Sequence, residues 1–373
     1  MPREPVGRRL AWYAAVAALA VAYLTYNFRL HRADLTAPLT APEGDAAAFL
    51  TLVTAVQEGG WPWRVDRAGA PGVAERLDYP VPEHAQTLYL RLLLQFTDNA
   101  FLAYNLWALS GYPLTAVCTF GVLRALGVSR AVGFAVAVLF AFLPYHAARA
   151  FTLLGHLHTV PLIAVPILWI VDGRLPFFGP SDDAGRRRLS VLNPTTGGTI
   201  LIAAIVATTS AYYAFFGCYF LVVAGLSRGV AERSVRPLLA ALATAAVVAA
   251  VGFACTLPFV LYQRDHGENP AVARRTANEA EVYCLKVTQL ILPAETHRVN
   301  GLGHLTRTYN AAAPLVNENR DSTLGVVGVA GLVILLGRLL GGGGPARLEG
   351  GLAILTLSAL LLGASGGFGS LFN

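Results

Sequence analysis

Long apolar runs separated by polar stretches form the main pattern of the chain. The first run extends from Leu10 to Leu30, long enough for one helix to cross about 30 Å of hydrocarbon at about 1.5 Å per residue. The other runs lie at about 100–123, 131–145, 157–171, 198–226, 237–262, 323–340 and 350–365. These runs predict membrane-spanning helices, and they leave two long polar segments, 31–99 and 263–322.

The run at 198–226 is longer than one span requires. Its roughly 29 residues would give a helix of about 43 Å, and the polar and aromatic stretch TTSAYYAF lies near its middle, at 208–215. We therefore expect two short helices that meet in a hairpin at this stretch, with the tip toward the outside. With that division the count becomes about nine membrane segments.

Composition places the chain in the membrane class. Hydrophobic residues make up 55% of it and charged residues only 13%, whereas soluble domains contain about a quarter charged residues. The net charge of +6 would suit a nucleic-acid partner, but the arginines lie at the ends of apolar runs and form no stripe with interleaved aromatic residues. We expect an all-α polytopic protein that has the lipid bilayer, and no nucleic acid, as a partner.

Short loops rich in arginine set the predicted orientation, because such loops stay on the cytoplasmic side of a membrane. They contain Arg124 and Arg130, Arg174 with the triplet 186–188, Arg228, Arg233 and Arg236, and Arg338 and Arg347. Arg3, Arg8 and Arg9 place the N-terminus on the same side, and the first run lacks the small-x-small cleavage site of a signal peptide. The prediction is a multi-pass protein of the cytoplasmic (inner) membrane with both long polar segments outside.

The first long segment begins with an amphipathic pattern. In GDAAAFLTLVTAVQEGGW, Ala48, Leu52 and Val56 fall on one helical face. We expect a helix that lies on the membrane surface, followed by a second apolar stretch, TLYLRLLLQF, that returns the segment to the membrane. Asp45 stands at the start of the first of these helices, where an N-cap is the ordinary role of an aspartate.

Polar side chains gather at the predicted outer surface. The turn LPYHAARAFTLLGHLHTVP brings His146, Arg149, His156 and His158 close together, which favours a polar site over scattered structural histidines. The remaining candidates for ligand binding in the two long segments are His84, His297, Arg298, Tyr309, Asn317 and Glu318.

Metal chemistry and disulfides find little support in the sequence. Three of the four cysteines lie in apolar runs, only Cys284 lies in a polar stretch, and no CxxC pair occurs. The NEN stretch at 317–319 offers one carboxylate between two amides, which is too small a ligand set for a metal ion. Neither a metal nor a cofactor is expected.

The order of several short motifs resembles that of a known class. They are GDAAAFL, EGGWPW, LDYP, LAYNL, LGVSR, FAFLPYH, SAYYAFF and, in the second long segment, ETHRVNGLGHLTRTYNAAAPLVNENRDSTLGVVG. Together they resemble a bacterial group within the GT-C class of integral membrane glycosyltransferases. The resemblance implies a single GT-C-like transmembrane domain over 1–373. It also implies transfer of a sugar from a polyprenyl-phosphate-linked donor to a glycan, lipid or protein acceptor at the outer membrane face.

The resemblance also assigns roles to particular residues. In that class, an acid near the start of the first outer loop commonly acts as the base that deprotonates the acceptor. Asp45 matches this position, and Asp34 matches it less well. Arg149 and Arg298 are the candidates for the carrier phosphate, because arginine binds phosphate in a bidentate manner. Pairing with nearby acids, or reaching toward lipid headgroups, is the structural alternative for each arginine.

Two other functions fit parts of the pattern. A transporter or flippase of lipid-linked sugars would need ionisable groups deep inside the spans or broken helices in repeated halves. A non-catalytic membrane scaffold is the third interpretation. The chain ends in GGFGSLFN directly after an apolar run, whereas proteins of the resembled group generally continue into further spans. We therefore expect a short or truncated member.

Overall fold

The computed structural model describes residues 5–41, 43–79, 83–179, 188–272, 276–341, 348–365, 367 and 369. Within these ranges the chain is all-α, with fifteen α-helices and a single two-stranded hairpin. The helices are α1 (Val6–Asn27), α2 (Gly44–Gln57), α3 (His84–Leu93), α4 (Ala100–Ala125), α5 (Arg130–Ala141), α6 (Pro144–Arg149), α7 (Thr159–Val171), α8 (Pro194–Thr209), α9 (Ala211–Glu232), α10 (Arg236–His266), α11 (Ala277–Val282), α12 (Val287–Ile291), α13 (Asn300–Ala312), α14 (Gly325–Leu340) and α15 (Leu348–Gly363).

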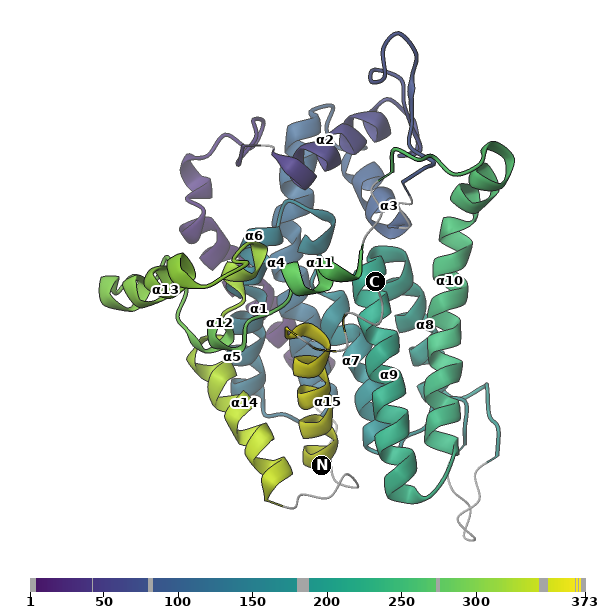
Figure 1. Ribbon diagram of the computed structural model, residues 1–373, viewed down its shortest axis with the longest axis vertical. Coiled ribbons are helices and arrows are strands. Elements are labelled where there is room, and N and C mark those ends of the chain that lie inside the picture. Colours follow the sequence, from purple (N-terminus) through teal and green to yellow (C-terminus); the bar gives the residue numbers. More distant parts are fainter. Residues whose placement is uncertain are drawn as a thin grey trace.

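Short elements fill the connections between these helices. Three 3₁₀ turns, η1 (Leu30–Arg32), η2 (Leu153–Gly155) and η3 (Glu318–Asp321), lie in the loops. Strands β1 (Arg64–Val65) and β2 (Ala74–Glu75) pair antiparallel and form the hairpin above α2 and α3 in Figure 1. The predicted inner loops at 186 and 347 and most of the C-terminal GGFGSLFN lie outside the described residues.

Polar residues at the predicted boundaries start several of the helices. The side chain of Asn99 accepts a hydrogen bond from the Leu102 amide at 2.8 Å and caps α4, and Ser129 caps α5 in the same way. Between these two helices, Gly127 adopts a positive φ of 82°, which glycine tolerates without steric cost and which ends α4. The short loop 126–129 thereby turns the chain back on itself.

Four helices of the described chain, α1, α4, α9 and α10, are long and apolar enough to cross a membrane. The shortest of them have 22 residues, or about 33 Å at about 1.5 Å per residue. Every other predicted run also forms a helix, but α5, α7, α8, α14 and α15 have only 12 to 16 residues. The four long helices suit a multi-pass membrane protein. The finer count of nine segments stays a prediction.

The predicted division of the run at 198–226 is confirmed. Helix α8 ends at Thr209 and α9 begins at Ala211, because Ser210 between them has an extended backbone with φ −156° and ψ 118°. Only α8 is short, since α9 continues for 22 residues. The polar residues in the middle of this apolar run therefore marked a real break in the helix.

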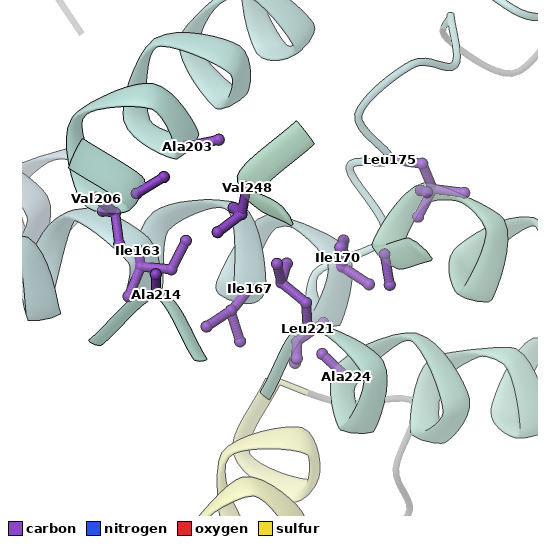
Figure 2. Close-up of a cluster of buried hydrophobic side chains, with 14 residues drawn as sticks. Ile163, Ile167, Ile170, Leu175, Ala203, Val206, Ala214, Leu221, Ala224 and Val248 are labelled. Atoms are coloured by element: carbon purple, nitrogen blue, oxygen red, sulfur yellow. The ribbon is translucent and has the colours of Figure 1, made fainter. Parts of the chain in front are cut away.

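The largest core cluster lies where α7, α8, α9 and α10 pack together (Figure 2). Its side chains are nearly all aliphatic, with Ile167 of α7 and Leu221 of α9 near its centre. Helices α9 and α10 approach closely at Gly225, where an added Cβ would lie 2.6 Å from the Cβ of Ala241. Small residues at such crossings let apolar helices pack without the help of a hydrophobic driving force.

Helix α2 packs its apolar face on α4 and not on lipid. Phe49 and Val53 are buried, and the Phe49 ring lies 4.3 Å from that of Trp107. Leu52 and Val56 of the predicted face are buried as well, but Ala48 is exposed. The apolar face of α2 therefore belongs to the protein core. The prediction that this face lies on a membrane surface is corrected accordingly.

Helix α3 has the exposed apolar stripe that was expected of a lipid-facing segment. Leu88 and Leu92, four residues apart on the helix, are 58% and 55% exposed, and Phe96 in the turn after α3 is 82% exposed. On the opposite side, Gln86 and Leu90 are buried against the rest of the protein. The pattern fits a helix that lies between the bundle and a lipid surface.

Candidate functional site

Asp34 is part of a local turn. Its Oδ1 accepts hydrogen bonds from the backbone amide of Thr36 at 2.8 Å and from the Thr36 hydroxyl at 2.6 Å. These bonds lower the pKa of Asp34. The turn is fixed to α4 by the buried Asn105, whose amide donates to the carbonyls of Leu35 and Ala37, each at 2.8 Å. The carboxylate therefore already has a structural use.

Asp45 lies in the first turn of α2 and is exposed. The predicted N-cap role is wrong, because Glu43 occupies the N-cap position and no side chain caps this helix start. A tyrosine side chain of α4 instead contacts this first turn. The Tyr104 hydroxyl donates to the carbonyl of Phe151 at 2.6 Å and approaches that of Ala46 at 3.4 Å. This contact sets the start of α2 beside the chain that follows α6.

Arg149, at the end of α6, forms an ion pair with Glu318 of η3, although 169 residues separate the two in the sequence. The guanidinium side chain is only 17% exposed. Burial disfavours its charged form, but the hydrogen bond and charge of Glu318 outweigh burial and raise the pKa of Arg149, with smaller contributions from Tyr145 and Asp45. Asp45 is thus close enough to act on Arg149 through its charge. Asp45, Arg149 and Glu318 are called the charge cluster below.

The members of the charge cluster come from three distant parts of the chain, α2, α6 and η3, and the ion pair joins the last two. Its third member is held by a network of amides around it. Asn317 caps η3 by accepting from the Asn319 amide at 3.1 Å, and its own amide donates to the Val282 carbonyl at 2.6 Å. The buried Asn319 donates to the Cys284 carbonyl at 3.0 Å. The two asparagines of NEN thus fix the loop that carries Glu318.

The histidines near α6 are buried among aromatic rings. His146 stacks on Tyr112 at 4.0 Å, and its Nδ1 lies 2.6 Å from the Ala141 carbonyl oxygen. The ring centroid of His156 lies 4.7 Å from that of Trp107 and 5.5 Å from that of His158. Burial lowers the pKa of His146 and that of His158 to about 4, and it also lowers the pKa of His156 well below its ordinary value. All three rings are therefore neutral near pH 7 and supply no cation.

The other candidates lie apart from the charge cluster. His84 places its Nε2 3.0 Å from the Cys255 carbonyl oxygen and packs beside Trp61, so it joins α3 to α10. His297 and Arg298 are exposed just before α13, and Tyr309 is half-buried on that helix. Helix α13 projects from the side of the molecule in Figure 1. In the described part of the chain, Arg298 forms neither a hydrogen bond nor an ion pair with the charge cluster.

The side chains of Glu83 and Gln86, at the start of α3, contact the break between α8 and α9. The sequence did not predict this contact. A Glu83 carboxylate oxygen accepts from the Ala211 amide at 3.4 Å, at the first turn of α9. The Gln86 amide donates to the carbonyls of Leu153 at 3.0 Å and Thr209 at 2.5 Å. The break between α8 and α9 is thus covered by α3. The polar TTS stretch inside an apolar run was the signal that a partner was needed.

Metal binding has no visible basis among the described residues, where no group of three or more His, Cys, Asp or Glu side chains has suitable geometry. All four cysteines are free thiols. Chemically, the charge cluster offers a solvent-exposed carboxylate and a partly buried guanidinium at one end of the helical bundle. No family model, curated protein or solved structure matches the chain.

Proposed function

We propose that this protein is a membrane glycosyltransferase of the GT-C type in the cytoplasmic membrane. It would transfer a sugar from a polyprenyl-phosphate-linked donor to an acceptor at the outer face. The observation that carries the proposal is the charge cluster, in which Arg149 pairs with Glu318 and the charge of Asp45 acts on Arg149. A base and a phosphate-binding cation at one site are what this reaction needs.

In the proposed reaction, Asp45 takes the proton of the acceptor hydroxyl while the oxygen attacks the anomeric carbon of the donor sugar. The bond between that carbon and the phosphate oxygen breaks, and the polyprenyl phosphate leaves with the electron pair. Arg149 stabilises the negative charge that grows on this phosphate. Its present partner, Glu318, is 61% exposed, so exchange of this carboxylate for a phosphate needs little rearrangement.

The positions of charges in the long helices disfavour transport. In α1, α4, α9 and α10, the described Arg, Lys, Asp and Glu residues all lie within the terminal two turns. A transporter of charged lipid-linked sugars would need ionisable groups nearer the centre of its spans. Transport therefore remains the weaker alternative, and movement of an intact donor across the bilayer without its cleavage would support it instead.

The decisive test is the substitution Asp45→Asn. We expect release of polyprenyl phosphate from the donor sugar, measured in proteoliposomes with a panel of polyprenyl-phosphate sugars, to fall by a factor on the order of 10² to 10⁴. Because Asp45 does not cap α2, thermal unfolding should hardly change. Glu58→Gln removes a carboxylate at the other end of the same helix and is the matched control. Full activity in Asp45→Asn would exclude Asp45 as the base.

The second test concerns the carrier phosphate. Arg149→Gln should weaken use of the donor by about ten-fold or more, because one charge-assisted hydrogen bond typically contributes about 1.5–3 kcal/mol. Arg149→Lys should restore only part of this loss, since lysine lacks the bidentate fork. Arg298→Gln, which removes an exposed arginine outside the charge cluster, should have the smaller effect. A larger loss in Arg298→Gln than in Arg149→Gln would move the phosphate away from α6.

A further inference from the structure

A second, separate site lies at the opposite end of α4. A hollow of about 330 Å³ opens where the start of α1, the last turn of α4 and the start of α5 meet. Its lining consists of Arg9, Trp12, Tyr13, Phe120, Gly121, Arg124, Ala125 and Arg130. Three arginines from three helices therefore face one hollow, and its described lining contains no carboxylate.

The local sequence explains why the arginines converge. Arg124 ends α4 and Arg130 begins α5, and the tight loop between them depends on Gly127 and on the Ser129 cap. The Arg124 guanidinium donates to the Val128 carbonyl, which fixes this side chain against the loop. Arg130 takes part in a further interaction of its own. Arg9 reaches the hollow from α1, which packs along α4.

Aromatic rings form part of the wall of the hollow. Trp12 packs edge-on against Phe134, with the ring centroids 6.1 Å apart. Tyr13 packs edge-on against Phe120, with the ring centroids 5.1 Å apart. Tryptophan and tyrosine are enriched where transmembrane helices pass from hydrocarbon to headgroups. The hollow lies at the ends of α1 and α4, two helices that are long and apolar enough to cross a membrane.

We propose that this hollow binds the phosphate group of an anionic phospholipid headgroup. Three guanidinium groups concentrate positive charge at the hollow, and guanidinium is the cation that suits phosphate oxygens best. The volume lies at the lower end of the range of ligand pockets, about 300–1,000 Å³. Basic pockets between transmembrane helices recognise such headgroups. This site is independent of the charge cluster and of the proposed sugar transfer.

Native mass spectrometry of the full chain in detergent tests the proposal. Phosphatidylglycerol is the anionic probe, phosphatidylcholine is the zwitterionic one, and inorganic phosphate represents a free anion. We expect the parent protein to retain phosphatidylglycerol in preference to the other two. The double variant Arg9→Gln with Arg124→Gln should retain about ten-fold less of it. Arg236→Gln, which removes an arginine at the start of α10 outside the hollow, should behave like the parent.

Three results would overturn the proposal. The first is equal retention of phosphatidylglycerol by the parent and the double variant, and the second is equal retention of the zwitterionic lipid by the parent. The third is a phosphate adduct that forms in the parent where the lipid adduct does not, which would assign the hollow to a free anion. Circular dichroism checks that the double variant is folded. If it is not, the single variants Arg9→Gln and Arg124→Gln decide by the same comparison.

Discussion

Glu83 is a carboxylic acid that is only 6% exposed, held beside the first turn of α9. Burial raises its pKa from an ordinary 4.5 to about 7, while the hydrogen bond from the Ala211 amide acts in the opposite direction. In the folded protein this acid therefore keeps its proton over a pH range in which the unfolded chain has already lost it. Protonation of one residue is thus linked to the stability of the fold.

The sign of this linkage gives a prediction. Between about pH 4.5 and pH 7 the folded state binds more protons at Glu83 than the unfolded state does, so stability falls as the pH rises through this window. The difference corresponds to a free energy on the order of 3 kcal/mol. Glu83→Gln stays neutral and should remove this part of the pH dependence. Its unfolding temperature should therefore exceed that of the parent at pH 8 by more than at pH 5.

The buried histidines act in the opposite direction and have to be separated from Glu83. Because the pKa values of His146, His156 and His158 are lowered, these residues destabilise the folded state as the pH falls below about 6.5. They are present in the parent and in Glu83→Gln alike, so the difference between the two proteins isolates Glu83. A difference that does not vary with pH would mean that Glu83 is ionised in the fold.

The candidate site could be predicted from the sequence only in part. Arg149 and Glu318 were candidates because they are polar residues in predicted outer segments, and Asp45 was a candidate because the resemblance places an acid near the start of the first of these segments. The sequence could not bring them together, since the packing of α6 against η3 decides that contact. The histidines were selected for their spacing, but spacing does not reveal burial. His146 and His156 belong to the aromatic core.

At the scale of elements, Gln86 makes the closer of the two polar contacts between the start of α3 and the helix break. Gln86 is buried and satisfies two carbonyls, those of Leu153 and Thr209, that would otherwise lack a partner. The carbonyl of Thr209 lies at the end of α8, where helical carbonyls have no partner within the helix. An amide from a neighbouring helix supplies the missing donor.

Loss of this amide should therefore be costly. We expect Gln86→Ala to lower the free energy of unfolding by about 2–4 kcal/mol, because two buried carbonyls lose their donor. Gln95→Ala is the matched control, since the Gln95 side chain is exposed just after the end of α3 and its hydrogen bond is to the nearby Arg91 carbonyl, at 3.5 Å. This control should change stability by less than about 0.5 kcal/mol. Unfolding in mixed detergent micelles measures both, and equal effects would contradict a bridging role for Gln86.

The helices themselves were largely predictable. Apolar runs give the approximate bounds of all the long helices, since only a helix satisfies its own backbone in a membrane. The break at Ser210 was visible because polar residues interrupt a long apolar run. The number of spans was not, because an apolar helix as short as the 13 residues of α7 suits a buried core as well as a membrane.

The whole molecule presents apolar side chains along its long helices, as a lipid surround requires. On α10, for example, Phe253, Leu257 and Leu261 are 40% to 58% exposed. Contiguous exposed apolar surface of this kind marks contact with lipid or protein. The predicted orientation of the bundle rests on the arginine-rich loops.

Labelling with a membrane-impermeant maleimide checks that orientation. Cys substitutions at Arg67, whose side chain is 83% exposed in the hairpin, and at Leu192, which is 99% exposed before α8, provide the two reporters. In intact cells Arg67→Cys should react, whereas Leu192→Cys should react only after permeabilisation. The four native thiols are buried or half-buried, so the parent gives the background. The reverse pattern would invert the topology.

The contacts of α3 have a consequence for how the protein is made. His84 and Gln86 bond to carbonyls 171 and 123 residues further along the chain. At about 5–20 residues per second, a ribosome needs on the order of 10 to 30 s to synthesise the more distant of these partners. Throughout that interval the segment that forms α3 has emerged without the distant carbonyls to which it bonds. A nascent chain halted before α10 should therefore expose this segment to protease, and completed synthesis should protect it.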